Sequence, residues 1–270
     1  IPALAGKNDL IVSDSLNHAS IIDGIRLSRA EYRIFPHNDI ACLEKILAME
    51  REQYETVLII TESIFSMDGD RADLQALVAV KNRYDALLYI DEAHSAGLFG
   101  SEGQGLCFAE GVAGQVDILL GTMGKALASH GAYIITRPVI KDYLVNCSRS
   151  LIYTTALPPV AVSWSLFVLR QMPFLAGRRK HLETLSAWFR QALEKEGLSL
   201  AGDSHIIPVM VGSNGKTVAI SEQLFEQGIL AFAIRPPSVP VNQARIRFSM
   251  TADIVSDDIS AIPALIKELI

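Results

Sequence analysis

Apolar residues form two kinds of run along this 270-residue chain. Short apolar runs at residues 9–14 and 86–91 predict strands, and the continuous β-branched run at 56–61 is typical of a buried parallel strand. Residues 40–52 and 73–83 instead carry apolar side chains at helical spacing. Strand, helix and strand in this order predict βαβ units, and therefore an α/β fold with a mostly parallel sheet.

The pattern changes after about residue 138. Before it, further strands are predicted at 31–35, 116–121 and 132–136, and Asn17 is a predicted N-cap of a helix. After it come long helical periods at 159–172 and 178–196, strands at 205–211, 229–233 and 245–250, and helices at 217–227 and 257–269. We expect a large α/β domain over residues 1–196, ending in a connecting helix, and a small α+β domain over residues 197–270.

Composition narrows the class of protein. Half of the residues are hydrophobic and the net charge is -6, which argues against a nucleic-acid groove. Cys42, Cys107 and Cys147 are too few and too scattered for a disulfide framework or a zinc site, so we expect inert thiols and no metal. No apolar run approaches the ~20 uncharged residues of a membrane span, and no signal peptide is visible. We expect a cytoplasmic protein, and an N-terminal segment ahead of Ile1.

Polar side chains follow three of the predicted strands. These segments are Glu62–Asp70, Asp91–His94 and Thr122–Lys125. Each alone is ordinary, since a lone aspartate often caps a helix and a lone lysine is usually solvated. Together at the carboxyl ends of parallel strands they predict a ligand site. A lysine that forms a Schiff base with an aldehyde, and an aspartate that keeps a pyridine nitrogen protonated, are what pyridoxal 5'-phosphate requires.

Four segments resemble the α-oxoamine synthases, in order along the chain. They are Asp14–Ser20, Thr61–Asp70, Asp91–Gly97 and Gly121–Leu127. These enzymes use pyridoxal 5'-phosphate to condense an amino acid with an acyl thioester, releasing CO2. The resemblance implies the aspartate aminotransferase-like fold of PLP-dependent transferases, with a mostly parallel large domain and a small C-terminal α+β domain. It also implies a homodimer with shared active sites.

The resemblance assigns roles to matching positions. Lys125 would carry the cofactor and move the proton at the substrate α-carbon, and Asp91 would pair with the pyridine nitrogen. His94 would bond the phenolic oxygen, and His18 would stack on the ring and orient the substrate. The further cofactor contacts would be Glu62, Ser66, Thr122 (at the phosphate, as at a helix N-terminus), Thr154 and Thr155. The two last threonines resemble a pair that reaches the neighbouring subunit's phosphate; a helix-capping turn is the alternative.

Two further segments, Ser148–Pro159 and Ala233–Pro240, resemble the biotin-pathway branch of the family. That branch joins L-alanine to a pimeloyl thioester of CoA or acyl carrier protein. Ser238 would contact substrate, and Arg235 could clamp a carboxylate with its planar fork. Ala128 and Ser95 depart from the pattern, since glycine is frequent at both positions.

Other functions stay open at this stage. One is another condensation of the same family, such as that of serine palmitoyltransferase or 2-amino-3-ketobutyrate CoA ligase. A second is an inactive partner subunit, although such subunits usually lose the lysine. A plain dinucleotide-binding domain is not supported, because no G-x-G-x-x-G follows a predicted strand.

Overall fold

The computed structural model describes residues 1–270, which form two compact units. The first unit holds residues 1–64 and 72–174, and the second holds residues 65–71 and 175–270. The α/β class predicted from the sequence is confirmed. The two units part between Phe174 and Leu175, whereas the domain boundary near Gly197 stays a prediction.

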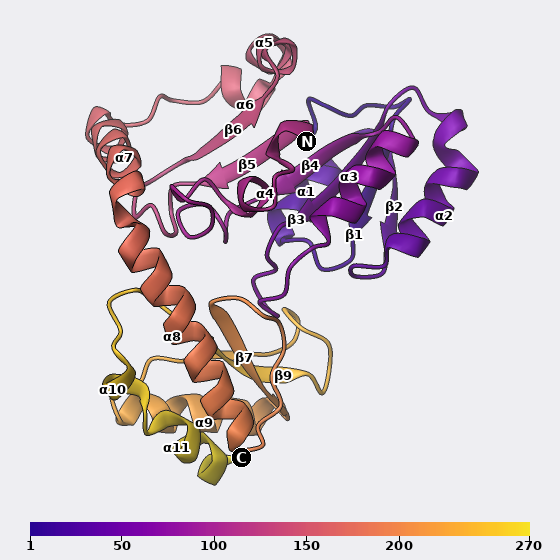
Figure 1. The fold of residues 1–270 in the computed structure, drawn as a ribbon. Helices are drawn as coiled ribbons and strands as arrows, with labels where there is room; N and C mark the ends of the chain where they lie inside the picture. The colour runs from indigo at the N-terminus through magenta and orange to yellow at the C-terminus, as the bar shows by residue number, and fades with distance from the viewer. The chain divides into compact units, whose positions relative to one another are not determined.

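A six-stranded sheet forms the centre of the first unit (Figure 1). Its strands, in spatial order, are β2 (Glu31–Phe35), β1 (Leu10–Asp14), β3 (Val57–Glu62), β4 (Leu87–Asp91), β5 (Ile118–Thr122) and β6 (Ala132–Thr136). The first five run parallel and β6 runs antiparallel to β5. Only residues 123–131 join β5 to β6, too few for the crossover that a parallel pair needs.

Helices link the parallel strands and complete the core. They are α1 (Ala19–Leu27), α2 (Ile40–Glu50), α3 (Leu74–Arg83) and the short α4 (Leu106–Ala109), with 3-10 turns at Arg51–Gln53 and Ala113–Gln115. Ile21 and Ile25 of α1 pack with Ile11, Leu58 and Ile60 of the sheet, and all five are buried. Burying an aliphatic side chain of this size contributes about 1.5–3 kcal/mol.

The predicted N-cap at Asn17 is wrong. His18 caps α1, because its Nδ1 accepts the backbone N–H of Ser20 at 3.2 Å. The Asn17 side chain is buried instead, and its amide donates to Ser13 Oγ and to the Ile60 carbonyl, both at 2.8 Å. Asn17 therefore ties β1 to β3 directly before the helix begins.

Three helices of the first unit leave most of their surface exposed. Helices α5 (Pro138–Cys147) and α6 (Arg149–Ile152) bury no residue, and α7 (Pro159–Gln171) buries only Ser165. The run Pro159–Lys195, which continues through a 3-10 turn at Met172–Leu175, is long and apolar enough to match a membrane span. One such run is a weak indication, since core helices pass the same test. The sequence pattern does not reveal this run, because Arg170 interrupts the apolar stretch.

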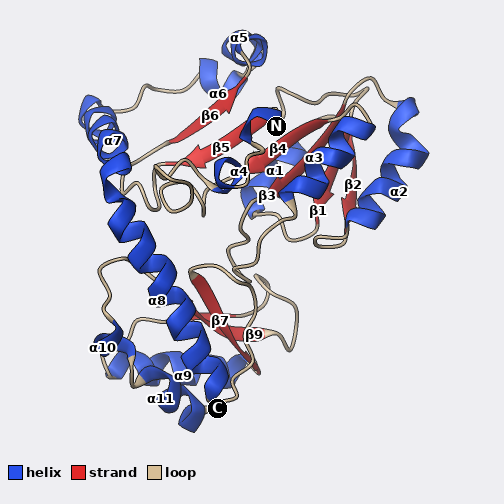
Figure 2. Ribbon diagram, viewed as in Figure 1, coloured by secondary structure: helices blue, strands red, loops and turns tan.

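The second unit is a small α+β domain (Figure 2). Strands β7 (Ile206–Gly212), β9 (Ala244–Ser249) and β8 (Phe232–Ile234) form an antiparallel sheet in that order. Its helices are α8 (Ala176–Lys195), α9 (Asn214–Glu226), α10 (Ser256–Ile259) and α11 (Ile262–Leu269). The Phe189 ring of α8 meets the Phe248 ring of β9 edge-on, with 5.3 Å between centroids. The sequence predicted a single helix at 257–269, but this segment forms two helices, α10 and α11.

The segment 65–71 packs within the second unit although it follows β3. Arg245 of β9 is buried and pairs with Asp68, while Arg247 donates to the Ser66 carbonyl at 3.0 Å. Gly69 has a φ of +69°, and a Cβ there would lie 2.2 Å from the Ile206 carbonyl oxygen. Only glycine fits such a close backbone approach.

Candidate active site

Four parallel strands end in polar residues at one edge of the large sheet. Asp14, Glu62, Asp91 and Thr122 are the last residues of β1, β3, β4 and β5. Glu62 and Asp91 are direct register partners between β3 and β4. Since register partners project from the same face, two carboxyl groups stand side by side.

Glu62 is almost fully buried, with 3% of its surface exposed. Burial, and then the negative charge of Asp91, raise the pKa of Glu62 to about 8. Its Oε1 accepts the backbone N–H of His18 at 2.6 Å, and the positive charge of Lys125 also favours the ionised form. At neutral pH Glu62 is therefore a protonated carboxyl group that can donate one hydrogen bond.

Asp91 is also buried, and burial raises its pKa. The Ala93 N–H donates to its Oδ1 at 2.8 Å, and the charges of Lys125 and His18 oppose the shift. The positive charge of Lys125 lowers the pKa of both carboxyl groups, so the predicted lysine lies near both predicted acids. This is the arrangement that the sequence predicts from separate strand ends.

The two predicted histidines flank this pair of acids. The exposed His18 heads α1, where its Nδ1 lies 2.9 Å from Ser20 Oγ. With Nδ1 fixed by Ser20, the ring is oriented and its faces stay accessible. His94 is half-buried, three residues after Asp91 in the turn that follows β4.

Lys125 lies on the loop of residues 123–131, which closes on itself. Met123 N–H donates to the Gly131 carbonyl at 2.9 Å, and Ser129 N–H donates to the Met123 carbonyl at 2.7 Å. Ala128 N–H donates to the Lys125 carbonyl at 2.9 Å. These bonds hold the lysine backbone in one short turn, with the side chain largely exposed at the sheet edge.

A buried network beneath the acids was not predicted from the sequence. Ser95, one of the two departures from the family pattern, lies 2.9 Å from Ser63 Oγ and donates to Glu92 Oε1 at 3.0 Å. Ser63 N–H in turn donates to the Asp91 carbonyl at 2.9 Å. Glu92 also accepts the Cys107 N–H at 2.7 Å. Two features of the sequence pointed to this network: the adjacent acids at 91 and 92, and the departure from the family pattern at Ser95.

The remaining predicted residues lie as follows. Thr122 Oγ1 donates to the Gly131 carbonyl at 3.3 Å and accepts the Gly124 N–H at 3.2 Å. No helix begins after Thr122, so the expected helix N-terminus is wrong, and its phosphate contact stays a prediction. Thr154 and Thr155 are exposed between α6 and α7. Ser66, Arg235 and Ser238 belong to the second unit, where the two last are exposed.

The residues fit pyridoxal 5'-phosphate. Burial raises the pKa of Asp91 despite the charges of Lys125 and His18, and a protonated pyridine nitrogen would further favour its ionised form. An amine for the aldehyde is present in Lys125, and an open imidazole face is present in His18. Among residues 1–270 no cluster of three His, Cys, Asp or Glu side chains could hold a metal ion.

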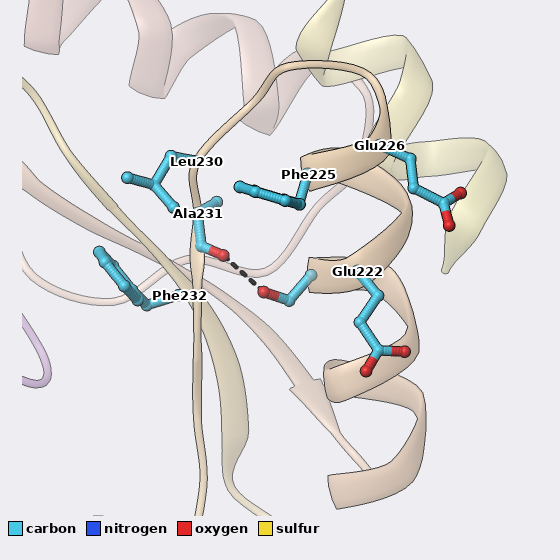
Figure 3. Close-up of a pocket in the computed structure, with 7 residues that line it drawn as sticks. Glu222, Phe225, Glu226, Leu230, Ala231 and Phe232 are labelled. Atoms are coloured by element: carbon cyan, nitrogen blue, oxygen red, sulfur yellow. Dashed lines mark hydrogen bonds between the residues drawn. The ribbon is translucent and has the colours of Figure 1, made fainter.

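A separate hollow lies in the second unit (Figure 3). It has a volume of about 450 Å³ and lies between α9 and the segment that leads into β8. Its lining is Ser221, Glu222, Phe225, Glu226, Leu230, Ala231 and Phe232. None of these is a predicted site residue, so the hollow plays no part in the site built above.

Comparison with known proteins identifies the family of the chain. The family described as Aminotransferase class I and II matches residues 1–262. The chain is 48% identical over its whole length to 8-amino-7-oxononanoate synthase of Chlorobaculum parvum, of which it covers 69%. It is 44% identical, over 98% of its length, to the enzyme of the same name from Haemophilus ducreyi, of which it covers 70%.

Solved structures give the same fold. A serine palmitoyltransferase from S. paucimobilis, solved with a bound PLP-myriocin aldimine, matches 99% of the chain with a TM-score of 0.93 and 29% identity. The chain covers 68% of that protein. An 8-amino-7-oxononanoate synthase from Francisella tularensis matches 99% of the chain with a TM-score of 0.84 and 30% identity, with 77% of it covered.

Proposed function

The chain belongs to the class I and II aminotransferase family and to its α-oxoamine synthase branch, and we propose that it makes 8-amino-7-oxononanoate from L-alanine and a pimeloyl thioester. The reaction joins the two substrates and releases CO2 and the thiol, as a step of biotin biosynthesis. One observation carries the proposal: Lys125 lies within electrostatic reach of the two register-paired acids, Glu62 and Asp91. Relatives that are 44–48% identical and carry this enzyme name support the choice of substrates.

Pyridoxal 5'-phosphate supplies an aldehyde that condenses with amines and an electron-poor ring that stabilises negative charge on the neighbouring carbon. Lys125 would hold the aldehyde, Asp91 the ring nitrogen and His94 the phenolic oxygen. His18 would cover one face of the ring. The remaining proposed contacts are Glu62, Ser66, Thr122, Thr154 and Thr155.

The chain's own residues then divide the proton chemistry. The Lys125 amine takes the proton from the α-carbon of alanine and later returns one to the product; proton transfer of this kind contributes about 10²–10⁴-fold. Asp91 would pair with the ring nitrogen of the cofactor, whose positive charge favours the ionised carboxylate. Glu62, whose pKa is raised to about 8, can donate a hydrogen bond without adding a second negative charge. His18 orients the substrate, whose carboxylate and chain are the proposed contacts of Arg235 and Ser238.

We propose a homodimer with shared active sites. Helices α5, α6 and α7 expose large apolar side chains, among them Tyr143, Leu151, Val160, Trp164 and Phe167. Many exposed large apolar side chains on neighbouring helices of the chain are typical of a subunit interface. Thr154 and Thr155 lie within the same exposed stretch, which fits the proposed contact with a neighbouring subunit's phosphate. We propose that the enzyme works in the cytoplasm.

Two measurements test the function. Borohydride reduction of the protein mixed with pyridoxal 5'-phosphate should leave a pyridoxyl group on the peptide that contains Lys125, and Lys125→Ala should abolish it. Lys141→Ala, an exposed lysine paired with Asp142, is the matched control and should label normally. No label on the Lys125 peptide would overturn the proposal.

Substrate identity is tested by thiol release from a panel of amino acids and acyl-CoA thioesters. L-Alanine with pimeloyl-CoA should give the highest kcat/KM. The alternative is serine with palmitoyl-CoA, favoured by the TM-score of 0.93 to serine palmitoyltransferase. If that pair reacts fastest, the family assignment stands and the proposed substrates fall.

A further inference from the structure

Helix α7 is joined to the Lys125 loop by polar contacts. The Trp164 indole N–H donates to the Ala128 carbonyl at 2.8 Å. One residue further along each segment, Ser165 Oγ lies 2.7 Å from Ser129 Oγ. Ser165 is the only residue that α7 buries, so this helix meets the loop through hydroxyl and indole groups rather than through an apolar stripe.

Ala128, to which Trp164 bonds, has a strained backbone. Its φ of +46° lies in the left-handed region, which alanine rarely adopts. Glycine is the usual residue here in the family pattern, and glycine would adopt this conformation without strain. A strained residue keeps its conformation only where several contacts fix it. Here they are the Trp164 bond to its carbonyl and the bond of its own N–H to the Lys125 carbonyl.

We infer that Trp164 is a positioning residue for Lys125. Its indole N–H holds the strained turn at Ala128, and this turn fixes the backbone that presents the lysine amine. Ser165 supports the same turn through Ser129. The inference rests on the proposed function, in which Lys125 carries the cofactor.

The first test measures hydrogen exchange of the apoprotein by mass spectrometry. Trp164→Phe keeps an aromatic ring and removes the N–H donor. Amides of Met123, Ala128 and Ser129, whose hydrogen bonds close the loop, should exchange about tenfold faster, which equals about 1.4 kcal/mol of opening free energy. Trp188→Phe, the chain's other tryptophan, lies on α8 and should leave the loop unchanged.

The second test measures how fast visible absorbance develops when pyridoxal 5'-phosphate joins Lys125. Trp164→Phe should slow this step severalfold, and Trp188→Phe should not. Ser165→Ala gives an independent arm if Trp164→Phe does not fold, and should change both measurements in the same direction.

Three results would overturn the inference. They are equal exchange in the two tryptophan variants, faster exchange across the whole first unit rather than in the loop, and an unchanged rate of cofactor attachment in Trp164→Phe. Exchange is measured without cofactor, so it stays informative if the wild type binds none. A wild type that binds no pyridoxal 5'-phosphate would instead contradict the proposed function.

Discussion

Glu62 and Asp91 are register partners at the ends of β3 and β4, so two buried carboxyl groups face the same side of the sheet one strand apart. Two negative charges at this spacing in a buried site repel each other. The repulsion adds to burial and raises the pKa of Glu62 to about 8, and burial also raises the pKa of Asp91. A cation placed beside this pair, such as a protonated pyridine nitrogen, would favour the ionised form of Asp91.

The raised pKa of Glu62 predicts a pH-dependent stability. An acid whose pKa is higher in the folded than in the unfolded state makes the folded state bind more protons, so stability falls as pH rises between the two values. For Glu62 this window runs from about 4.5 to about 8, with a slope approaching about 1.4 kcal/mol per pH unit. Glu62→Gln should remove this dependence and keep the acceptor for His18, so the apoprotein variant gains on wild type as pH rises.

Urea unfolding of the apoprotein at several pH values between 5 and 9 measures the difference. Glu55→Gln is the control, because Glu55 is exposed and its Oε1 accepts only from Asn8 in a surface contact. A constant difference between Glu62→Gln and wild type across this range would contradict the prediction.

Asp91→Asn should move stability and activity in opposite directions. Asparagine keeps the acceptor for the Ala93 N–H and removes the cost of burying an ionisable carboxyl group, so the apoprotein should become more stable at pH 8. The kcat should fall by about 10²–10³-fold, because the ring nitrogen loses its ionised partner. Asp39→Asn, the N-cap of α2, is the control and should be near neutral in both measurements. A less stable apoprotein with normal kcat would contradict the assignment of Asp91.

Local patterns predicted the elements that bury side chains. The continuous run at Val57–Glu62 is buried at every position, and the sequence predicts this strand to within one residue. Helix α5 was not predicted, because none of its residues is buried and no apolar stripe marks it. Helix α10 is separated from α11 by Ser260 and Ala261, a break that the shared apolar spacing of residues 257–269 conceals.

The site residues likewise divide into those that local sequence patterns predicted and those that depend on contacts distant in sequence. Glu62, Asp91 and Lys125 stand in segments at strand ends, so parallel topology alone predicts that they meet, whereas His18 was predicted only from the family resemblance. Trp164 could not be found this way, since it meets Ala128 across 36 residues and no spacing links them. Ser95 was visible only as a departure; its bonds to Ser63 and Glu92 depend on how the turns after β3 and β4 pack.

Gly105→Ala should strongly destabilise the first unit. A Cβ at Gly105 would lie 2.1 Å from Glu92 Oε2, and the φ of +117° is unfavourable for alanine. Glu92 is buried and cannot move without losing its bonds to Ser95 and Cys107. We expect a loss of about 3 kcal/mol or more in urea unfolding.

Gly111→Ala is the matched control for Gly105→Ala. Gly111 also has a positive φ, +73°, but no atom lies within 4 Å of its added Cβ. Only the backbone strain remains, so the loss should be about 1–2 kcal/mol. Equal losses in the two variants would show that the contact with Glu92 does not matter.

The Asp68–Arg245 pair predicts the last result. The Arg245 side chain is 1% exposed, so Asp68→Asn would leave a buried guanidinium without its counter-charge. Removing one partner of such a pair costs about 3–5 kcal/mol. Asp253→Asn provides the comparison, since Asp253 and Arg178 form a 2.7 Å pair whose side chains are 78% and 52% exposed. Breaking an exposed pair costs about 0–1 kcal/mol. Urea unfolding of both variants measures the two losses in unfolding free energy. Similar losses would mean that the burial of Arg245 does not set the strength of its ion pair.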